Sequence, residues 1–296
     1  MPVAAQNQPD WPEGATLLLG IGAQKAGTSW LHAYLRGHPA CSTGPMKELH
    51  YFDSLKTEGR LGRRLHTEAL EKAREKGAPA GRIKRLERLC AICEAPDPDH
   101  QGYLSLIGHK LRPGQVAVDI TPEYALVSDE VFRQMAALPN VRMIFIMREP
   151  VARFWSAVRM RAGKKSDAAG FEEAARALLD TMLAEGKGGA HRRSDYALTL
   201  DKLQRHVPED RRLVLFFEEL FTQQTADRIC AFLGIAPRPM DELGARNEGQ
   251  KATMRPDQVA RLTEAMRPQY EAVTRMFGMD VPQNWHARFA AGDVAA

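Results

Sequence analysis

An apolar segment that breaks into a glycine-bounded loop is the feature that most restricts how this chain can fold. Residues 16–21 read as a buried strand, residues 22–29 (GAQKAGTS) form the loop, and an apolar pattern resumes at Trp30. A strand, a loop and a helix in this order aim several backbone N–H groups and the positive end of a helix dipole at one point. We therefore predict a binding site for a phosphate-like anion, to which Lys25 adds a full positive charge.

The glycine spacing of this loop is related to that of a Walker P-loop, but its lysine is placed differently. Gly22 and Gly27 match the outer glycines of the motif. A P-loop kinase or nucleotidase needs a lysine and then a serine or threonine directly after the second glycine, where this chain has Thr28 and Ser29. Lys25 lies inside the loop instead. A nucleotide kinase stays an alternative, although it also requires an aspartate at a strand end to hold Mg²⁺.

A second strand-to-helix junction lies near the middle of the chain. Residues 141–147 (VRMIFIM) read as a buried strand, and residues 148–156 (REPVARFWS) read as a turn that leads into a helix. Arg148 comes directly after the strand, and the carboxyl ends of the strands are the usual ligand side of an open parallel sheet. This position suits an anionic ligand.

The two junctions together resemble the donor-binding motifs of sulfotransferases. QKAGTSW (24–30) resembles the loop that binds 5′-phosphosulfate, and residues 148–156 resemble the motif in which an arginine and a serine eight residues later grip a 3′-phosphate. The resemblance implies 3′-phosphoadenosine 5′-phosphosulfate as the donor, 3′-phosphoadenosine 5′-phosphate as the product, and no metal. The implied donor-binding residues are Gln24, Lys25, Ala26, Gly27, Thr28, Ser29, Trp30, Arg148 and Ser156 and, from a looser match to a basic loop, Arg246 and Lys251.

A third element supplies candidates for the catalytic base. MKELHYFD (46–53) resembles an element of the sulfotransferase branch that acts on heparan-type glycans, in which a glutamate deprotonates the acceptor. The resemblance implies Glu48 as the base, with His50 as the alternative because other branches use histidine. Partial burial is expected to raise the pKa of such a carboxylate toward neutrality. Lys25 is expected to neutralise the charge that develops on the oxygen between sulfur and the 5′-phosphate.

Two positions depart from the pattern of that branch. DITPEY (119–124) resembles its Glu-Lys-Thr-Pro-x-Tyr element, but Asp119 replaces the glutamate and Ile120 replaces a lysine that faces the acceptor. These departures argue against a heparan-type glycan as the acceptor. We expect instead a hydroxyl or amine of a carbohydrate or a small metabolite. A catalytically inactive nucleotide-binding protein of the same fold is the second alternative.

The order of the remaining segments predicts the fold class. Near-continuous apolar strands alternate with helical patterns, which favours a parallel sheet covered on both faces. We therefore expect an α/β protein with a three-layer P-loop-type fold, in which helices flank a central parallel sheet. The expected strands are 16–21, 40–43, 115–119, 141–147 and 212–217.

The chain reads as one domain over residues 16–296, preceded by a disordered or extended segment at 1–15. Residues 55–95 form a helical insertion of two amphipathic helices, which is either a structural addition or a lid over the acceptor. Cys90 and Cys93 continue the apolar stripe of the second helix, which favours core packing over a zinc site.

Charge and hydropathy narrow the possible partners. The 41 basic and 37 acidic residues are too evenly balanced for a general nucleic-acid binder. The sequence has no apolar run long enough to span a membrane, and its first residues lack the apolar core of a signal peptide. We therefore expect a cytoplasmic enzyme without integral membrane association, whose partner is its acceptor.

Overall fold

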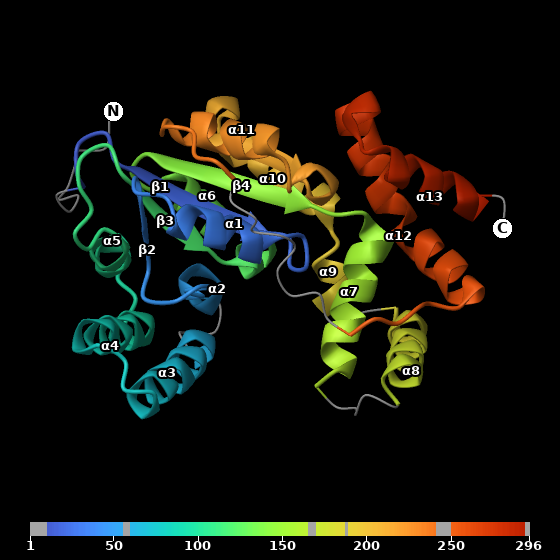
Figure 1. Ribbon diagram of the computed structural model, residues 1–296, viewed down its shortest axis with the longest axis horizontal. Coiled ribbons are helices and arrows are strands. Elements are labelled where there is room, and N and C mark those ends of the chain that lie inside the picture. Colours follow the sequence, from blue (N-terminus) through green and yellow to red (C-terminus); the bar gives the residue numbers. More distant parts are fainter. Residues whose placement is uncertain (1–10, 56–59, 165–169, 187–188, 241–249, 294–296) are drawn as a thin grey trace.

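A five-stranded parallel sheet forms the centre of the protein (Figure 1). The computed structural model describes residues 11–55, 60–164, 170–186, 189–240 and 250–293. The strands are β1 (Thr16–Gly22), β2 (Cys41–Thr43), β3 (Val116–Ile120), β4 (Val141–Met147) and β5 (Arg212–Phe216). They pair in parallel in the order β2-β3-β1-β4-β5. The predicted α/β class is confirmed, and all five predicted strands are present within one residue of their expected bounds.

Strand β1 occupies the middle of the sheet. All of its residues are buried, because β3 and β4 flank its edges and helices cover both faces. A methyl group on Gly20 would lie only 2.4 Å from Cδ1 of Ile120, so the close approach of β3 leaves room for glycine alone. The loop that follows β1 therefore emerges at the centre of the carboxyl edge of the sheet.

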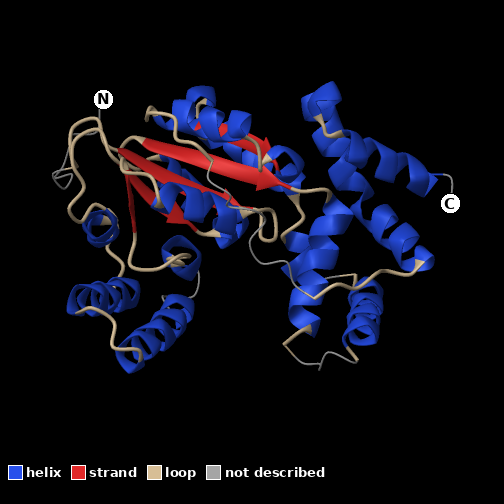
Figure 2. Cartoon of the chain, in the orientation of Figure 1, coloured by secondary structure: helices blue, strands red, loops and turns tan. Residues whose placement is uncertain are grey.

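Helices cover both faces of the sheet and give the predicted three layers (Figure 2). These helices are α1 (Thr28–Arg36), α6 (Asp129–Ala136), α10 (Tyr196–His206) and α11 (Gln223–Leu233). The Tyr34 hydroxyl of α1 lies 3.4 Å from the Cys230 thiol of α11. The rings of Phe132 in α6 and His206 in α10 lie 6.2 Å apart. Right-handed connections between parallel strands place α1 and α11 on one face of the sheet and α6 and α10 on the other.

A group of helices lies to one side of the sheet (Figure 1). They are α2 (Tyr51–Leu55), α3 (Arg60–Glu75), α4 (Ala80–Glu94) and α5 (Gln101–Ile107), of which α3 and α4 fall within residues 55–95, where two amphipathic helices were expected. Leu70 and Ala73 of α3 pack on Leu86 of α4 in a small core of their own. In α4, Cys93 is buried and Cys90 is half-buried, and both are free thiols.

The remaining helices come from the second half of the chain. They are α7 (Pro150–Ala162), which follows β4, α8 (Phe171–Glu185), α9 (Gly189–Arg192), α12 (Pro256–Phe277) and α13 (Gln283–Asp293). The start of α7 is held by Glu149, whose carboxylate accepts hydrogen bonds from the amides of Val151 at 3.0 Å and Ala152 at 2.8 Å, and from the Tyr270 hydroxyl of α12.

No membrane-spanning helix is found in the described part of the chain, because none of its helices combines the necessary length with sufficient apolar character.

Candidate active site

The loop between β1 and α1 has the geometry of an anion site. Gly27 precedes α1 with a φ of 91°, and no side chain caps the helix there. A methyl group on Gly27 would lie 2.3 Å from Cδ2 of Leu220, so both conformation and space require glycine. Helix α1 also begins at Thr28 without an acidic residue in its first turn, so its own side chains leave the positive end of the dipole uncompensated.

A cavity of about 1080 Å³ lies beside this loop, at the carboxyl edge of the sheet. Predicted site residues from separate stretches of the chain line it, namely Gln24, Lys25, Gly27, Thr28, Ser29, Trp30, Glu48, Arg148, Ser156 and Lys251. Ala26 is fully buried within the loop. His50 contacts Glu48 and is not among the residues that line the cavity. Arg246 lies outside the described residues.

The cavity is strongly basic. In the described part of the chain, six lysines and arginines line it, against one carboxylate, that of Glu48. The cations are Lys25, Lys47, Arg148, Arg159, Lys164 and Lys251. Burial lowers the pKa of Lys25, and the charges of Arg148, Arg159 and Lys47 lower it further. A bound polyanion would relieve this repulsion between like charges.

Arg148 is tied directly to the loop. Its Nη1 donates a hydrogen bond of 3.2 Å to the carbonyl oxygen of Lys25, and its guanidinium lies 4.3 Å from the centre of the Phe217 ring. The buried Tyr196 hydroxyl accepts from the amide of Arg148 at 3.3 Å and donates to its carbonyl oxygen at 2.7 Å. The two motifs, more than a hundred residues apart in sequence, therefore form one structure.

Arg153 is a second arginine that holds the loop. The sequence placed it only in a basic cluster suited to an anionic nucleotide and did not predict this role. It is fully buried in α7, and it donates to the carbonyl oxygen of Gln24 at 3.4 Å and to the Ser194 hydroxyl at 2.6 Å. Burial lowers its pKa to about 10, so the side chain stays charged at neutral pH. The sequence feature that could have indicated this role is the position of Arg153 among the apolar residues of 150–158, because a buried charge needs polar partners.

Glu48 belongs to a chain of alternating charges before and within α2. Its carboxylate contacts Lys47 and lies 3.6 Å from Nε2 of His50, whose Nδ1 lies 2.8 Å from the Asp53 carboxylate. Burial raises the pKa of Glu48, but the hydrogen bond from His50 and the charge of Lys47 outweigh burial and lower this pKa to about 2. The expected rise toward neutrality is therefore wrong, because burial does not act alone here.

His50 carries the opposite charge. Burial lowers its pKa, but hydrogen bonds to Asp53 and Glu48 outweigh that effect and raise the pKa to about 10. At neutral pH the pair therefore consists of an ionised Glu48 and an imidazolium at His50.

Replacing His50 by glutamine is expected to flatten the pH dependence of stability above neutrality. A group with a raised pKa in the folded state stabilises the protein fully below its unfolded pKa of 6.5, and this contribution is lost as the pH rises through about 10. Thermal unfolding midpoints measured across this window should therefore fall more steeply for the wild-type protein than for His50→Gln. Parallel curves would show that Glu48 and Asp53 do not hold a charged imidazole.

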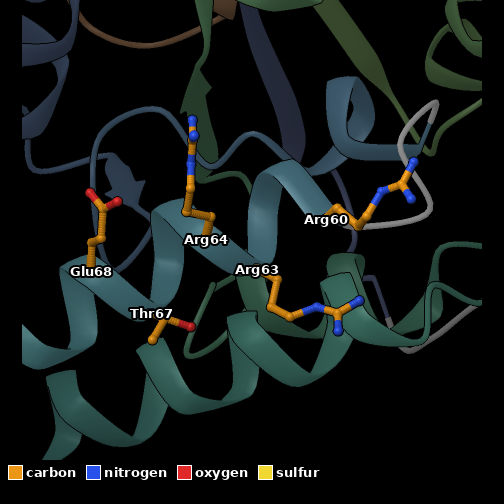
Figure 3. A pocket seen from close by; sticks show the side chains of 5 residues that line it. All are labelled: Arg60, Arg63, Arg64, Thr67 and Glu68. Atoms are coloured by element: carbon orange, nitrogen blue, oxygen red, sulfur yellow. The ribbon is translucent and has the colours of Figure 1, made fainter.

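A second hollow, of about 380 Å³, lies on the surface of α3 (Figure 3). Its lining residues are Arg60, Arg63, Arg64, Thr67 and Glu68, which are all exposed. The first turn of α3 contains no acidic residue, so the arginine charges add to the positive end of this helix. Since all of the lining side chains come from one helix, we treat the hollow as separate from the basic cavity.

A parallel sheet whose central strand ends in a basic, glycine-bounded loop defines the P-loop class of phosphate-binding proteins. A sequence profile of the sulfotransferase family matches residues 18–239, and the chain therefore belongs to that family. The comparison with curated proteins gave no significant match. No group of three or more His, Cys, Asp or Glu residues in the described ranges is arranged to hold a metal ion.

Two solved structures of sulfotransferases have a similar fold. The enzyme from Alicyclobacillus acidocaldarius is 20% identical, with a TM-score of 0.58 over 88% of this chain and 94% of that one. A sulfotransferase domain from the curacin biosynthetic pathway is 18% identical, with a TM-score of 0.50 over 83% of this chain and 82% of that one. At this level of identity the likeness supports the fold.

Proposed function

We propose that this protein transfers a sulfuryl group from 3′-phosphoadenosine 5′-phosphosulfate to a hydroxyl or amine of a carbohydrate or small metabolite. Membership of the sulfotransferase family supports the reaction type. The observation that carries the proposal is the basic cavity, whose walls include the loop at 22–29, Arg148 with Ser156, and Glu48. A donor with anionic groups at both ends and an acceptor that must lose a proton require such a combination.

The donor is proposed to lie between the two strand-to-helix junctions. The backbone N–H groups of Thr28 and Ser29, at the start of α1, suit its 5′-phosphate, with Lys25 beside them. Arg148 and Ser156 suit its 3′-phosphate, because an arginine forms charge-assisted hydrogen bonds with phosphate oxygens. The hydrogen bond from Arg148 to the Lys25 carbonyl supports a site in which both ends of the donor are held together.

The proposed reaction is an in-line displacement at sulfur. The acceptor oxygen or nitrogen forms a bond to sulfur while the bond from sulfur to the bridging oxygen of the 5′-phosphate breaks. The acceptor proton passes to Glu48, and the electron pair of the broken bond stays on the bridging oxygen, where Lys25 stabilises the charge. The products are the sulfated acceptor and 3′-phosphoadenosine 5′-phosphate, and Glu48 then returns its proton to solvent.

Glu48 is preferred over His50 as the base because Glu48 is ionised at neutral pH, whereas His50 is already protonated. An imidazolium has no free lone pair, so His50 in its present contacts has nothing with which to accept a proton. Glu48 is ionised and lines the cavity, although its low pKa makes it a weak base while Lys47 and His50 contact it. A shift of Lys47 toward the bound donor would raise the basicity of Glu48.

The two alternatives are less well supported. A nucleotide kinase would need lysine after Gly27 and an aspartate after β4, where this chain has Thr28 and Arg148. An inactive binding protein would have no need of an ionised carboxylate on the wall of a basic cavity, such as that of Glu48.

Adding 3′-phosphoadenosine 5′-phosphate without metal is expected to stabilise the protein. At a hundredfold excess over Kd, a ligand that binds only the folded state adds roughly 2.7 kcal/mol to the free energy of unfolding. Thermal unfolding with this bisphosphate should be compared with unfolding in ATP and Mg²⁺. Stabilisation by ATP and Mg²⁺ alone would replace the proposal with a kinase.

The matched variant for this measurement is Arg148→Ala. Its affinity for the bisphosphate should fall far more than its affinity for adenosine 5′-phosphate, since the charge-assisted contact to the 3′-phosphate is lost. An equal loss for both nucleotides would mean that Arg148 acts only through its bond to the Lys25 carbonyl.

A further inference from the structure

A buried carboxylate lies beneath the segment that carries Glu48, and the proposed chemistry does not use it. Asp119, near the carboxyl end of β3, is 1% exposed. Three hydroxyls surround it, those of Thr121 at 2.7 Å, Tyr124 at 2.8 Å and Tyr103 at 2.9 Å. A carboxylate accepts hydrogen bonds, so each of these hydroxyls donates its single proton to Asp119.

Two of the three hydroxyls also accept hydrogen bonds from the backbone amides of the residues on either side of His50. The Thr121 hydroxyl accepts from the amide of Leu49 at 2.9 Å, and the Tyr124 hydroxyl accepts from the amide of Tyr51 at 3.2 Å. Because Asp119 takes the proton of each hydroxyl, their lone pairs are left to accept these N–H groups. The Asp119 carboxylate thereby orients the hydroxyls of Thr121 and Tyr124 so that they accept from these two amides.

The segment held in this way has an unusual backbone. Glu48 has a φ of 62° and His50 a φ of 51°, in the left-handed region that residues other than glycine seldom occupy. Such conformations persist only where surrounding contacts enforce them, and they are frequent at functional sites. On its other side the segment is held by His66 of α3, whose Nε2 lies 2.6 Å from the carbonyl oxygen of Leu49.

We propose that Asp119 is a positioning residue, which orders the hydroxyls of Thr121 and Tyr124 so that they clamp the backbone around His50 and hold Glu48 at the cavity. The catalytic meaning of this clamp rests on the proposed function, in which Glu48 takes the acceptor proton. The clamp itself is a property of the unliganded protein. The Tyr103 hydroxyl donates to the same carboxylate and, among the described residues, accepts no hydrogen bond from the backbone of residues 46–53. The Tyr103 ring stacks on the Tyr51 ring with centroids 4.8 Å apart, a contact that Tyr103→Phe keeps.

The difference between Tyr103 and the other two hydroxyls gives a test that needs no acceptor. Thr121→Val and Tyr124→Phe remove one clamping hydroxyl each, and Tyr103→Phe removes the hydroxyl that does not clamp. None of the three substitutions removes a carboxylate or a basic group near His50. Each removes one hydrogen bond that lowers the pKa of Asp119, so that effect is common to all three variants and the Tyr103→Phe control accounts for it. The measurement is the pH titration of the His50 ring by NMR, assigned with His50→Gln.

Loss of the clamp should let the left-handed turn relax and weaken the contact between His50 and Glu48. The titration midpoint of His50 should therefore fall by about one unit or more in Thr121→Val and Tyr124→Phe and stay unchanged in Tyr103→Phe. Unchanged midpoints in all three variants, with lower unfolding temperatures, would reduce the network to a structural role and overturn the proposal. An equal fall in Tyr103→Phe would also overturn it, since that result indicates general loosening.

A second measurement separates this inference from the proposed function. Affinity for 3′-phosphoadenosine 5′-phosphate should be the same in Thr121→Val as in the wild-type protein, because the Thr121 hydroxyl bonds to Asp119 and the Leu49 amide and not to the described residues of the loop at 22–29. With an acceptor identified by a labelled donor, kcat of Thr121→Val should fall about tenfold or more at an unchanged KM for the donor. If the wild-type protein neither binds the bisphosphate nor transfers sulfate, the proposed function fails, while the His50 titrations still decide whether the clamp exists.

Discussion

Replacing Glu48 by glutamine is expected to reduce kcat by roughly 10²- to 10⁴-fold, the usual contribution of a positioned general base. The amide has nearly the same shape as the carboxylate but cannot accept the acceptor proton. Glu48 is also the one carboxylate among the described residues that line the cavity, so no neighbour there can replace it. The rate should be measured with labelled donor and an acceptor found by screening, alongside the affinity for 3′-phosphoadenosine 5′-phosphate, which should change little.

The control for this experiment is His50→Asn. It removes the imidazolium that holds Glu48 but leaves the carboxylate, so it should reduce kcat less than Glu48→Gln does. The opposite pattern, with near-normal turnover in Glu48→Gln and an inactive His50→Asn enzyme, would assign the base to His50. The protein would then be closer to the branches of the family that use histidine.

Replacing Lys25 by alanine is expected to reduce kcat by about 10²- to 10³-fold and to weaken donor binding as well. Lys25 is proposed to stabilise the charge that develops on the bridging oxygen, an interaction that is strongest in the transition state. It also lies among cations that attract the donor in the ground state, so kcat and donor affinity should fall together. This double effect distinguishes Lys25→Ala from Glu48→Gln, which should affect kcat alone.

Lys164→Ala is the matched variant for Lys25. Lys164 also lines the cavity, but it is exposed and lies after the end of α7, outside the loop between β1 and α1. It should contribute to donor affinity through its charge, in a way that added salt screens, with little effect on kcat. If both variants lost the same small factor in kcat, Lys25 would be one more attractive charge and the proposed stabilisation of the leaving group would be wrong.

The sheet was predictable because most residues of its four longer strands are apolar. Residues 141–147 form β4 with the expected bounds, since a strand covered by helices on both faces has no polar alternation to confuse the pattern. The two helices of the insertion were predictable from their amphipathic spacing. Helix α8 was not predicted, because the sequence alone did not indicate how Phe171, Leu179 and Met182 would find partners on α7 and α12.

The residues of the candidate site were also found from local patterns, but their electrostatics were not. Lys25 and Arg148 were predicted from the strands that they follow, and Glu48 from the resemblance of residues 46–53 to a sulfotransferase element. All three line one cavity. The pKa of Glu48 had the wrong expected direction, because it depends on the distances to His50 and Lys47 rather than on burial alone.

The sequence by itself determined the parallel α/β sheet and the glycine-bounded loop after its central strand, since hydrophobic periodicity and glycine positions act over a few neighbouring residues. The tertiary structure alone decided how the pieces support one another. Arg153 reaches the Gln24 carbonyl, and Asp119 orients hydroxyls toward the segment of Glu48, across separations in sequence of seventy residues or more. Hydrogen bonds and pKa values depend on distances of a few ångströms, and only the packing of the whole chain sets those distances.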